Sequence, residues 1–469
     1  MSNNRREFLK LSGLAGLGVV GTGFKGLSLE EQEQVLAQSK KKHAQRFNMS
    51  GYAAPKLEVV RVGIVGLGSR GPGAVNRLSK IEGVEIKALC DLRPEMVDKV
   101  VKSLEGTSHK PETYSGSAYA WKKMVDRDDL DLIYIATPWE WHTPMAVYAM
   151  EAGKHACSEV PIAVTLEECW QLVETSERTK KHCMMMENCC YDFFELMTLN
   201  MARDGFFGDV FHGEGAYIHD LLGLNFSKTG YQDMWRLKEN FRNGNLYPTH
   251  GLGPVCQAMN INRGDQMDYL TSLSSNDFLM KAHAQKLAET DNFYNSFATK
   301  SYRGNMNTTM VKTKKGKSIM IQHDVSSPRP YSRIHLLSGT KGAASKYPVP
   351  GISTGHEGWL KADEMKALEE KYTPEIVKKV GEMAKQIGGH GGMDFMMDWR
   401  MIDCIRNGLP LDQDVYDGAL WSAIGPLSEW SVANRSNSID VPDFTAGSWE
   451  TNSPVELTLK GGGTTGVHV

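Results

Sequence analysis

Three glycines near the start of the chain constrain its fold more than any other feature. They are Gly66, Gly68 and Gly71, spaced G-x-G-x-x-G, and they follow an apolar, β-branched run over residues 60–65. The run is typical of a buried strand, and the residues after the glycines are typical of a helix. The first glycine permits a tight turn, the second lets backbone approach a pyrophosphate, and the third allows close helix packing. We therefore expect a dinucleotide-binding domain, with the phosphates at the helix N-terminus.

A second apolar strand is predicted over residues 84–91, and it ends in Asp91. A carboxylate at this place accepts hydrogen bonds from ribose hydroxyls and repels a 2′-phosphate, which favours NAD over NADP. Arg93 lies close by and weakens that preference slightly. A third strand is predicted over residues 130–138, and ligands bind at the carboxyl ends of such strands in open α/β sheets.

The N-terminal segment combines the paired arginines Arg5 and Arg6 with a weakly apolar, glycine-rich run. That run is too short and too rich in glycine to span a bilayer stably. We interpret residues 1–30 as a twin-arginine export signal, which predicts a periplasmic, cell-surface or secreted protein. An amphipathic helix is the alternative, but the glycines disfavour it. Residues 31–56 are polar and are expected to form a linker or a loosely ordered arm.

Composition excludes several classes of protein. The chain is 41% hydrophobic and 23% charged, which is ordinary for a soluble globular protein. Its net charge of -3 gives no reason to expect a nucleic-acid or membrane-surface partner. The 8 cysteines in 469 residues do not make a disulfide scaffold. No Cys/His spacing matches a zinc pattern, so no metal is expected.

Two further motifs join the glycines and Asp91. A Thr-Pro pair ends the third strand, and G-K-H-x-x-x-E-x-P follows at residues 153–161. Together they resemble the glucose–fructose oxidoreductase / inositol dehydrogenase superfamily. The resemblance implies an α/β fold: a Rossmann domain with a doubly wound parallel sheet over residues 57–185, then an α+β domain with a large open mixed sheet over 186–469. Those dehydrogenases usually carry E-K-P, where this chain has Glu159-Val160-Pro161, so the lysine that helps proton transfer is missing.

Eight segments, taken together, resemble glycoside hydrolase family 109. They are PWEWH (138–142), EVP (159–161), ENCCYDFF (187–194), GAYIHDL (215–221), MWR (234–236), YPTHGLGP (247–254), SPRPYS (327–332) and GHGGMDF (389–395). The family's best-known activity is NAD-dependent α-N-acetylgalactosaminidase, and the resemblance implies a tightly bound NAD that is recycled in each turnover. The implied reaction oxidises the sugar at C3, removes the C2 proton, eliminates the aglycone, adds water and reduces C3 again. The result is hydrolysis with retention, without the carboxylate pair of ordinary glycosidases.

The same resemblance assigns candidate site residues. Oxidation at C3 and deprotonation at C2 each require a proton acceptor, which makes Tyr217, His219, Tyr247 and His250 the catalytic candidates. The residues expected to bind the cofactor are Gly66, Gly68, Ser69, Arg70, Gly71, Asp91, Trp139, Trp141, His142, Glu159, Val160 and Asn188. Those expected to bind substrate are Tyr217, Arg236, Tyr247, His250 and Tyr331. The role of His390, in a glycine-rich setting, is left open.

Local sequence also predicts how the catalytic candidates are carried. Tyr217 and His219 stand at i and i+2 of a predicted strand and therefore point to one face. Tyr247 and His250 lie in residues 243–253, where Gly and Pro predict a loop.

We accordingly predict an exported retaining glycosidase that acts on terminal α-N-acetylgalactosamine of a small molecule or glycan. The alternative is a net NAD-dependent sugar or cyclitol oxidoreductase, which Val160 disfavours. A non-catalytic, NAD-bound sugar sensor is a third hypothesis, and the intact Tyr/His set argues against it. We expect no nucleic-acid partner and no stable membrane span, and an open sheet face would favour a homodimer.

Overall fold

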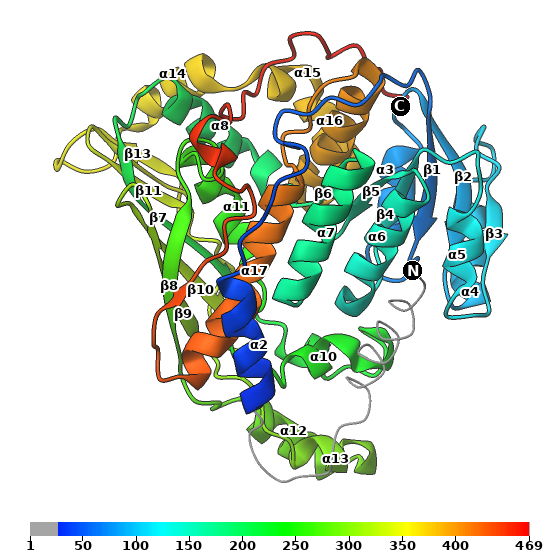
Figure 1. Ribbon diagram of the computed structural model, residues 1–469, viewed down its shortest axis with the longest axis horizontal. Coiled ribbons are helices and arrows are strands. Elements are labelled where there is room, and N and C mark those ends of the chain that lie inside the picture. Colours follow the sequence, from blue (N-terminus) through cyan, green and yellow to red (C-terminus); the bar gives the residue numbers. More distant parts are fainter. Residues whose placement is uncertain (1–26, 469) are drawn as a thin grey trace.

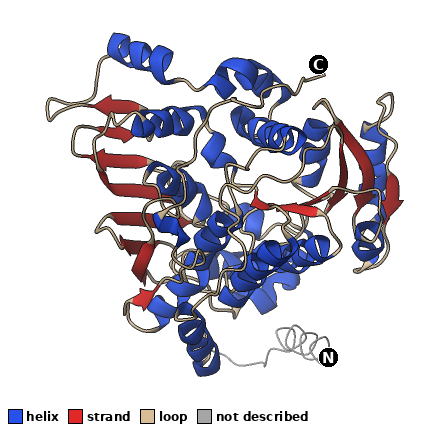
Figure 2. Ribbon diagram, turned by 45° about the horizontal axis from the view of Figure 1, so that its top comes forward, coloured by secondary structure: helices blue, strands red, loops and turns tan. Residues whose placement is uncertain are grey.

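The computed structural model describes residues 27–468. Arg5 and Arg6, and with them most of the expected export signal, lie outside the described residues. Two sheets lie at opposite sides of the molecule, with helices packed between them (Figures 1 and 2). Within the described part of the chain, no helix has the length and apolar character needed to cross a membrane.

The first sheet has six parallel strands in the order β3-β2-β1-β4-β5-β6. The strands are β1 Val60–Val65, β2 Val84–Cys90, β3 Glu112–Tyr114, β4 Leu132–Ile135, β5 His155–Ser158 and β6 Cys183–Met185. The helices that follow them are α3 Gly71–Leu78, α4 Pro94–Ser103, α5 Ala120–Val125, α6 His142–Glu151 and α7 Leu166–Thr179. This strand order is that of a Rossmann fold, so the expected doubly wound domain is confirmed.

The second sheet has eight strands in the order β13-β12-β11-β7-β10-β9-β8-β14. They are β7 Val210–Ile218, β8 Met267–Ser274, β9 Asn307–Thr313, β10 Ser318–Asp324, β11 Leu336–Gly339, β12 Ala343–Ser345, β13 Gly351–Ser353 and β14 Ile439–Asp440. Strands β7 and β10 are parallel, whereas β7 and β11 are antiparallel, so the sheet is mixed as expected. Tyr269, Leu273 and Met310 are exposed on this sheet. The homodimer that an open sheet face would favour stays a prediction.

The second half of the chain also forms helices. They are α8 Phe193–Arg203, α9 Leu222–Asn225, α10 Trp235–Glu239, α11 Thr249–Ala258, α12 Met280–Ala288, α13 Asn295–Ala298, α14 Ala362–Tyr372, α15 Glu375–Ile387, α16 Met393–Asn407 and α17 Val415–Ala433. Of these, α11 packs on β7 and α17 on β8. Helix α17 is apolar and almost fully buried, and in Figure 1 it runs through the middle of the molecule beside α7. A helix buried on all sides forms the centre of a large core.

The segment over residues 31–56 is more ordered than its polar composition predicts. Helix α2, Leu29–Ser39, begins with a capping box between Ser28 and Glu31. Beyond it, His43 Nε2 lies 2.8 Å from Glu177 Oε1, and the backbone N–H of Arg46 donates to Glu177 Oε2 at 2.8 Å. The expectation of a loosely ordered arm was therefore wrong, because a fully buried carboxylate on α7 holds the segment in place.

Candidate functional site

The glycine-rich loop after β1 has the packing that a dinucleotide site requires. Gly66 has φ +89°, and a Cβ there would lie 2.5 Å from the carbonyl oxygen of Ala136. A Cβ on Gly71 would lie 1.9 Å from the carbonyl oxygen of Gly66. A Cβ on Gly68, in contrast, would meet only an Arg93 nitrogen at 3.3 Å. The first and third glycines are thus needed for packing, while the second leaves the backbone open to a pyrophosphate at the start of α3.

Asp91 lies beside this loop at the end of β2. The backbone N–H of Leu67 donates to Asp91 Oδ2 at 2.7 Å, and that of Arg93 donates to Oδ1 at 2.9 Å. Arg93 Nε donates a third bond to Oδ1 at 3.4 Å. A carboxylate has about four acceptor positions, so one is left for a ribose hydroxyl. The loop and the carboxylate together fit the adenosine half of NAD.

Arg70 connects the glycine loop to α16 at the other end of the chain. Its guanidinium lies 3.1 Å from Glu159 Oε1 and 3.1 Å from Asp394 Oδ2. Asp394 also accepts from Asn188 Nδ2 at 2.5 Å and lies 2.9 Å from His390 Nδ1. Two cofactor candidates, Arg70 and Asn188, therefore converge with His390 on one carboxylate, which lies in the GHGGMDF motif and for which no role was predicted.

Trp139, Trp141 and His142 follow β4, and their side chains have different surroundings. Trp139 stacks on Tyr247, with ring centroids 5.4 Å apart and planes 17° apart, whereas Trp141 packs against Tyr119. His142 is buried, and its ring nitrogens lie 2.7 Å from the Pro161 carbonyl oxygen and 2.8 Å from that of Thr137. Burial lowers the pKa of His142. His142 thus joins two loops, and Trp139 borders the catalytic candidates. Val160 is buried next to Pro161.

The four catalytic candidates form one cluster. Tyr217 Oη lies 2.9 Å from His219 Nδ1, so the pair at the end of β7 face each other. The Tyr217 ring centroid is 4.7 Å from that of Tyr247 and 5.3 Å from that of His250. Tyr247 and His250 are 4.9 Å apart. Two separate segments of the chain thus bring together four rings that are able to transfer protons.

The loop predicted over residues 243–253 is only partly correct. Tyr247 lies in a loop, but His250 lies in the first turn of α11, which begins at Thr249. A Cβ on Gly251 would lie 2.1 Å from the Ala216 nitrogen, and one on Gly215 would lie 2.4 Å from the Gly251 oxygen. These glycines serve close packing of a helix on a strand rather than a turn. That contact brings His250 next to Tyr217.

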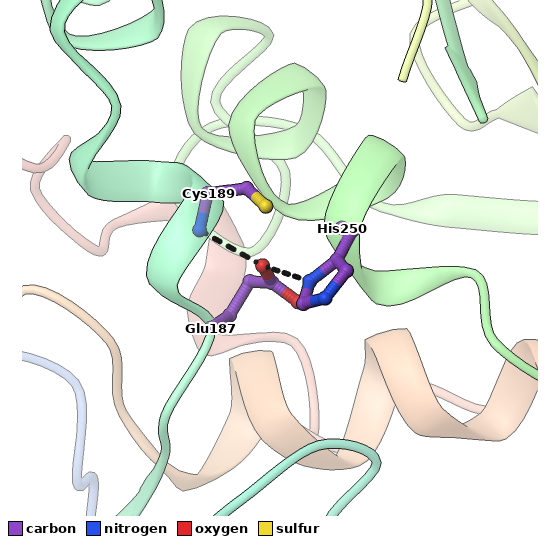
Figure 3. A group of neighbouring side chains, drawn as sticks. All are labelled: Glu187, Cys189 and His250. Atoms are coloured by element: carbon purple, nitrogen blue, oxygen red, sulfur yellow. Dashed lines mark hydrogen bonds and ion pairs between the residues drawn. The ribbon is translucent and has the colours of Figure 1, made fainter. Parts of the chain in front are cut away.

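Glu187 completes the cluster and was not predicted from the sequence. Its Oε1 lies 2.7 Å from His250 Nδ1 and accepts from the backbone N–H of Cys189 at 3.0 Å (Figure 3). Burial raises the pKa of Glu187, but the His250 ring and hydrogen bonds outweigh it and lower the pKa overall. A charged carboxylate at Nδ1 holds a proton on that atom and leaves Nε2 as the free acceptor. This arrangement would allow His250 to act as a general base.

Glu187, Cys189 and His250 could also be considered as metal ligands, since their ligand atoms lie within 4.8 Å of one another. Ligands around zinc lie at about 2.0–2.3 Å from the ion. The 2.7 Å contact between Glu187 and His250 leaves no place for an ion between them. Burial also raises the pKa of the Cys189 thiol well above its usual value. The group fits proton handling better than metal binding, and the expected absence of a metal stays a prediction.

Arg236 and Tyr331, the remaining substrate-binding candidates, border this cluster. The Arg236 guanidinium lies 5.0 Å from the Tyr247 ring centroid and 5.5 Å from that of Trp139. Burial raises the pKa of Tyr247, although Arg236 opposes it, so this phenol stays protonated. Burial, with the Arg236 charge, lowers the pKa of His219. Tyr331 is 39% exposed, and its ring is 5.0 Å from that of His219.

Comparison with known proteins matches both halves of the chain. The model of an oxidoreductase family with an NAD-binding Rossmann fold matches residues 60–187. The model of the glycosyl hydrolase 109 C-terminal domain matches residues 191–451. The first half is therefore an NAD-binding Rossmann domain.

Relatives extend this match over almost the whole chain. A glycosyl hydrolase family 109 protein from Shewanella pealeana is 47% identical, covering 97% of this chain and 99% of its own. An alpha-N-acetylgalactosaminidase from Shewanella oneidensis is 46% identical, covering 97% and 98%. Among solved structures, levoglucosan dehydrogenase with NADH and levoglucosan has a TM-score of 0.62 at 16% identity, covering 82% of this chain and 100% of its own. At that identity the likeness concerns the fold alone.

Proposed function

The chain belongs to glycoside hydrolase family 109 and is a glycoside hydrolase, and from that premise we propose a substrate and a mechanism. We propose that it hydrolyses terminal α-N-acetylgalactosamine with retention, using one tightly bound NAD that is recycled in each turnover. The activity named for the relative at 46% identity supports this sugar. The glycine loop and Asp91 support the cofactor.

The contact between Glu187 and His250 carries the mechanistic proposal. NAD, when bound, supplies reversible oxidation at C3 of the sugar. Oxidation at C3 acidifies the C2 proton, and His250 Nε2, with Tyr247 beside it, accepts protons at this C3/C2 end. The aglycone then leaves C1 by elimination, and water adds in its place.

Tyr217 and His219 are proposed to serve the remaining proton transfers, including that to the leaving oxygen. Their 2.9 Å contact allows a proton to pass between phenol and imidazole. The Arg236 guanidinium offers a fork of donors to the sugar hydroxyls or the acetamido oxygen. The absence of lysine at Val160 agrees with a site in which tyrosine and histidine do this work.

The proposal is tested by incubating the protein with an aryl α-N-acetylgalactosaminide in heavy water without added cofactor. We expect release of N-acetylgalactosamine with deuterium at C2 and a retained anomeric configuration, both measured by NMR. Accumulation of NADH without release of the aryl group would instead support the sugar oxidoreductase. Neither product with this or related 2-acetamido sugars would overturn both.

We also propose that the protein is exported in folded form by the twin-arginine route. The paired arginines Arg5 and Arg6 before a glycine-rich apolar run support this, and a signal of this kind suits a protein that acquires NAD before export. Changing both arginines to lysine should retain the protein in the cytoplasm, as measured by cell fractionation. The matched change Lys10→Arg should not, and equal export of the two variants would refute the route.

A further inference from the structure

A buried ion cluster lies behind Tyr331. The Arg333 side chain is only 3% exposed, and its guanidinium lies 2.6 Å from Glu195 Oε1 and 2.9 Å from Asp192 Oδ2. Lys346 Nζ contacts the same two carboxylates at 2.8 Å and 2.5 Å. Burial raises the pKa of Glu195, but Arg333 and Lys346 outweigh it and lower the pKa to about 2. Asp192 and Glu195 thus hold the Arg333 guanidinium in place, and Lys346 contacts the same two side chains.

Arg333 reaches from this cluster to the wall of the sugar site. Its Nη1 donates to Tyr331 Oη at 3.3 Å, and its guanidinium lies 6.0 Å from the Tyr331 ring centroid and 5.7 Å from that of Tyr347. Its carbonyl oxygen accepts from the backbone N–H of Ala216 at 2.8 Å. The residue before the catalytic Tyr217 is therefore tied to Arg333, and Tyr331 is set beside β7.

The backbone that follows Arg333 is strained. Ile334 has φ +60° and His335 has φ +48°, in the left-handed region that a β-branched residue rarely adopts. Such a conformation is unfavourable and persists only where the surroundings hold it. His335 is held by Thr198 Oγ1, 2.9 Å from its Nε2. Strain of this kind is typical of ligand clamps, which agrees with a positioning role for the segment.

We propose that Arg333 is a positioning residue for substrate binding: it fixes the Tyr331 phenol beside His219, where that phenol contacts the bound glycoside. Arg333 acts through Tyr331 and itself touches neither sugar nor cofactor. Its planar fork can hold a carboxylate with one nitrogen and a phenol with another, which a lysine ammonium on a flexible stem cannot reproduce. The inference rests on the proposed function in taking this cluster as the sugar site.

The test is a double-mutant cycle between Arg333→Lys and Tyr331→Phe, with KM and kcat measured on an aryl glycoside that the wild type turns over. We expect each single change to raise KM about tenfold, the loss of one hydrogen bond from a charged donor, with kcat changed less than about threefold. The double variant should be no worse than either single one, because both remove the same contact. Lys346→Met is the matched control, since it disturbs the same carboxylates without contacting the Tyr331 hydroxyl, and its KM should stay near that of the wild type.

The inference is overturned if Arg333→Lys leaves KM unchanged while Tyr331→Phe raises it, or if the two effects multiply. It is equally overturned if Lys346→Met raises KM as much as Arg333→Lys, since this would indicate a general loss of structure. Should Arg333→Lys fail to fold, Glu195→Asp draws the guanidinium back from Tyr331 and must raise KM likewise. Wild-type protein without turnover would refute the proposed function instead, which separates the two failures.

Discussion

Replacing His250 with alanine is expected to lower kcat by about 10²- to 10⁴-fold, the usual contribution of a positioned general base. The imidazole is the one catalytic candidate that contacts a buried carboxylate, through the 2.7 Å contact between its Nδ1 and Glu187. Without the ring, the proton at the C3/C2 end of the sugar has no ready acceptor, because burial raises the pKa of the neighbouring Tyr247 well above its usual value and keeps that phenol protonated. The loss is measured as steady-state kcat on the aryl glycoside, with the NAD content of the purified protein determined alongside.

Two further variants separate catalysis from structure. Glu187→Gln retains a hydrogen-bond acceptor but removes the charge, and is expected to lower kcat about 10- to 100-fold, the value of a hydrogen bond to a charged group. His356→Ala removes a histidine that is 95% exposed and should leave kcat unchanged. If His250→Ala retained more than a tenth of wild-type kcat while binding NAD normally, His250 would not be the base.

The Rossmann fold of the first domain could be predicted because its signals are local. A β-branched run, a fixed glycine spacing and an acid at the next strand end all lie within residues 60–91. The helix that carries His250 could not be predicted in the same way, because the glycines beside it are typical of a turn. Their role in packing depends on the contact between Gly251 and Gly215, which lies 36 positions earlier in the sequence.

The candidate site likewise combines residues that could be predicted from the sequence with residues that could not. The tyrosines and histidines could be assigned roles because their side chains transfer protons, whereas the roles of Glu187 and Asp394, which also lie in quoted motifs, depend on partners far along the chain. Glu187 contacts His250 across 63 positions, and Asp394 meets Asn188 across 206. A charged residue beside an apolar segment gives no sign of which distant side chain it will hold. Arg333 was not predicted for the same reason, because its partners Asp192 and Glu195 lie at the start of α8, far from it in the sequence.

Replacing Gly68 or Gly71 of the dinucleotide loop with alanine is expected to impair the protein in two different ways. In Gly71→Ala, the new methyl group would lie 1.9 Å from the Gly66 carbonyl oxygen, so α3 must move away from β1. Overpacking of this kind costs about 1–3 kcal/mol, and we expect a lower melting temperature that excess NAD does not restore. In Gly68→Ala, the nearest atom is the end of the flexible Arg93 side chain at 3.3 Å, so the folded protein tolerates the methyl group.

The methyl group of Gly68→Ala should instead occupy the space that a pyrophosphate requires. We expect NAD affinity to fall about 10- to 100-fold, with less NAD in the purified protein, and the melting temperature to recover in excess NAD because bound ligand stabilises the folded state by mass action. Gly73→Ala, where the new Cβ lies 3.1 Å from the end of the Arg77 side chain, is the matched control within α3 and should retain NAD. Recovery of Gly71→Ala in excess NAD, or full NAD content in Gly68→Ala, would contradict the assignment of packing to the third glycine and phosphate approach to the second. The two variants thus test separately how this loop is built and what it binds.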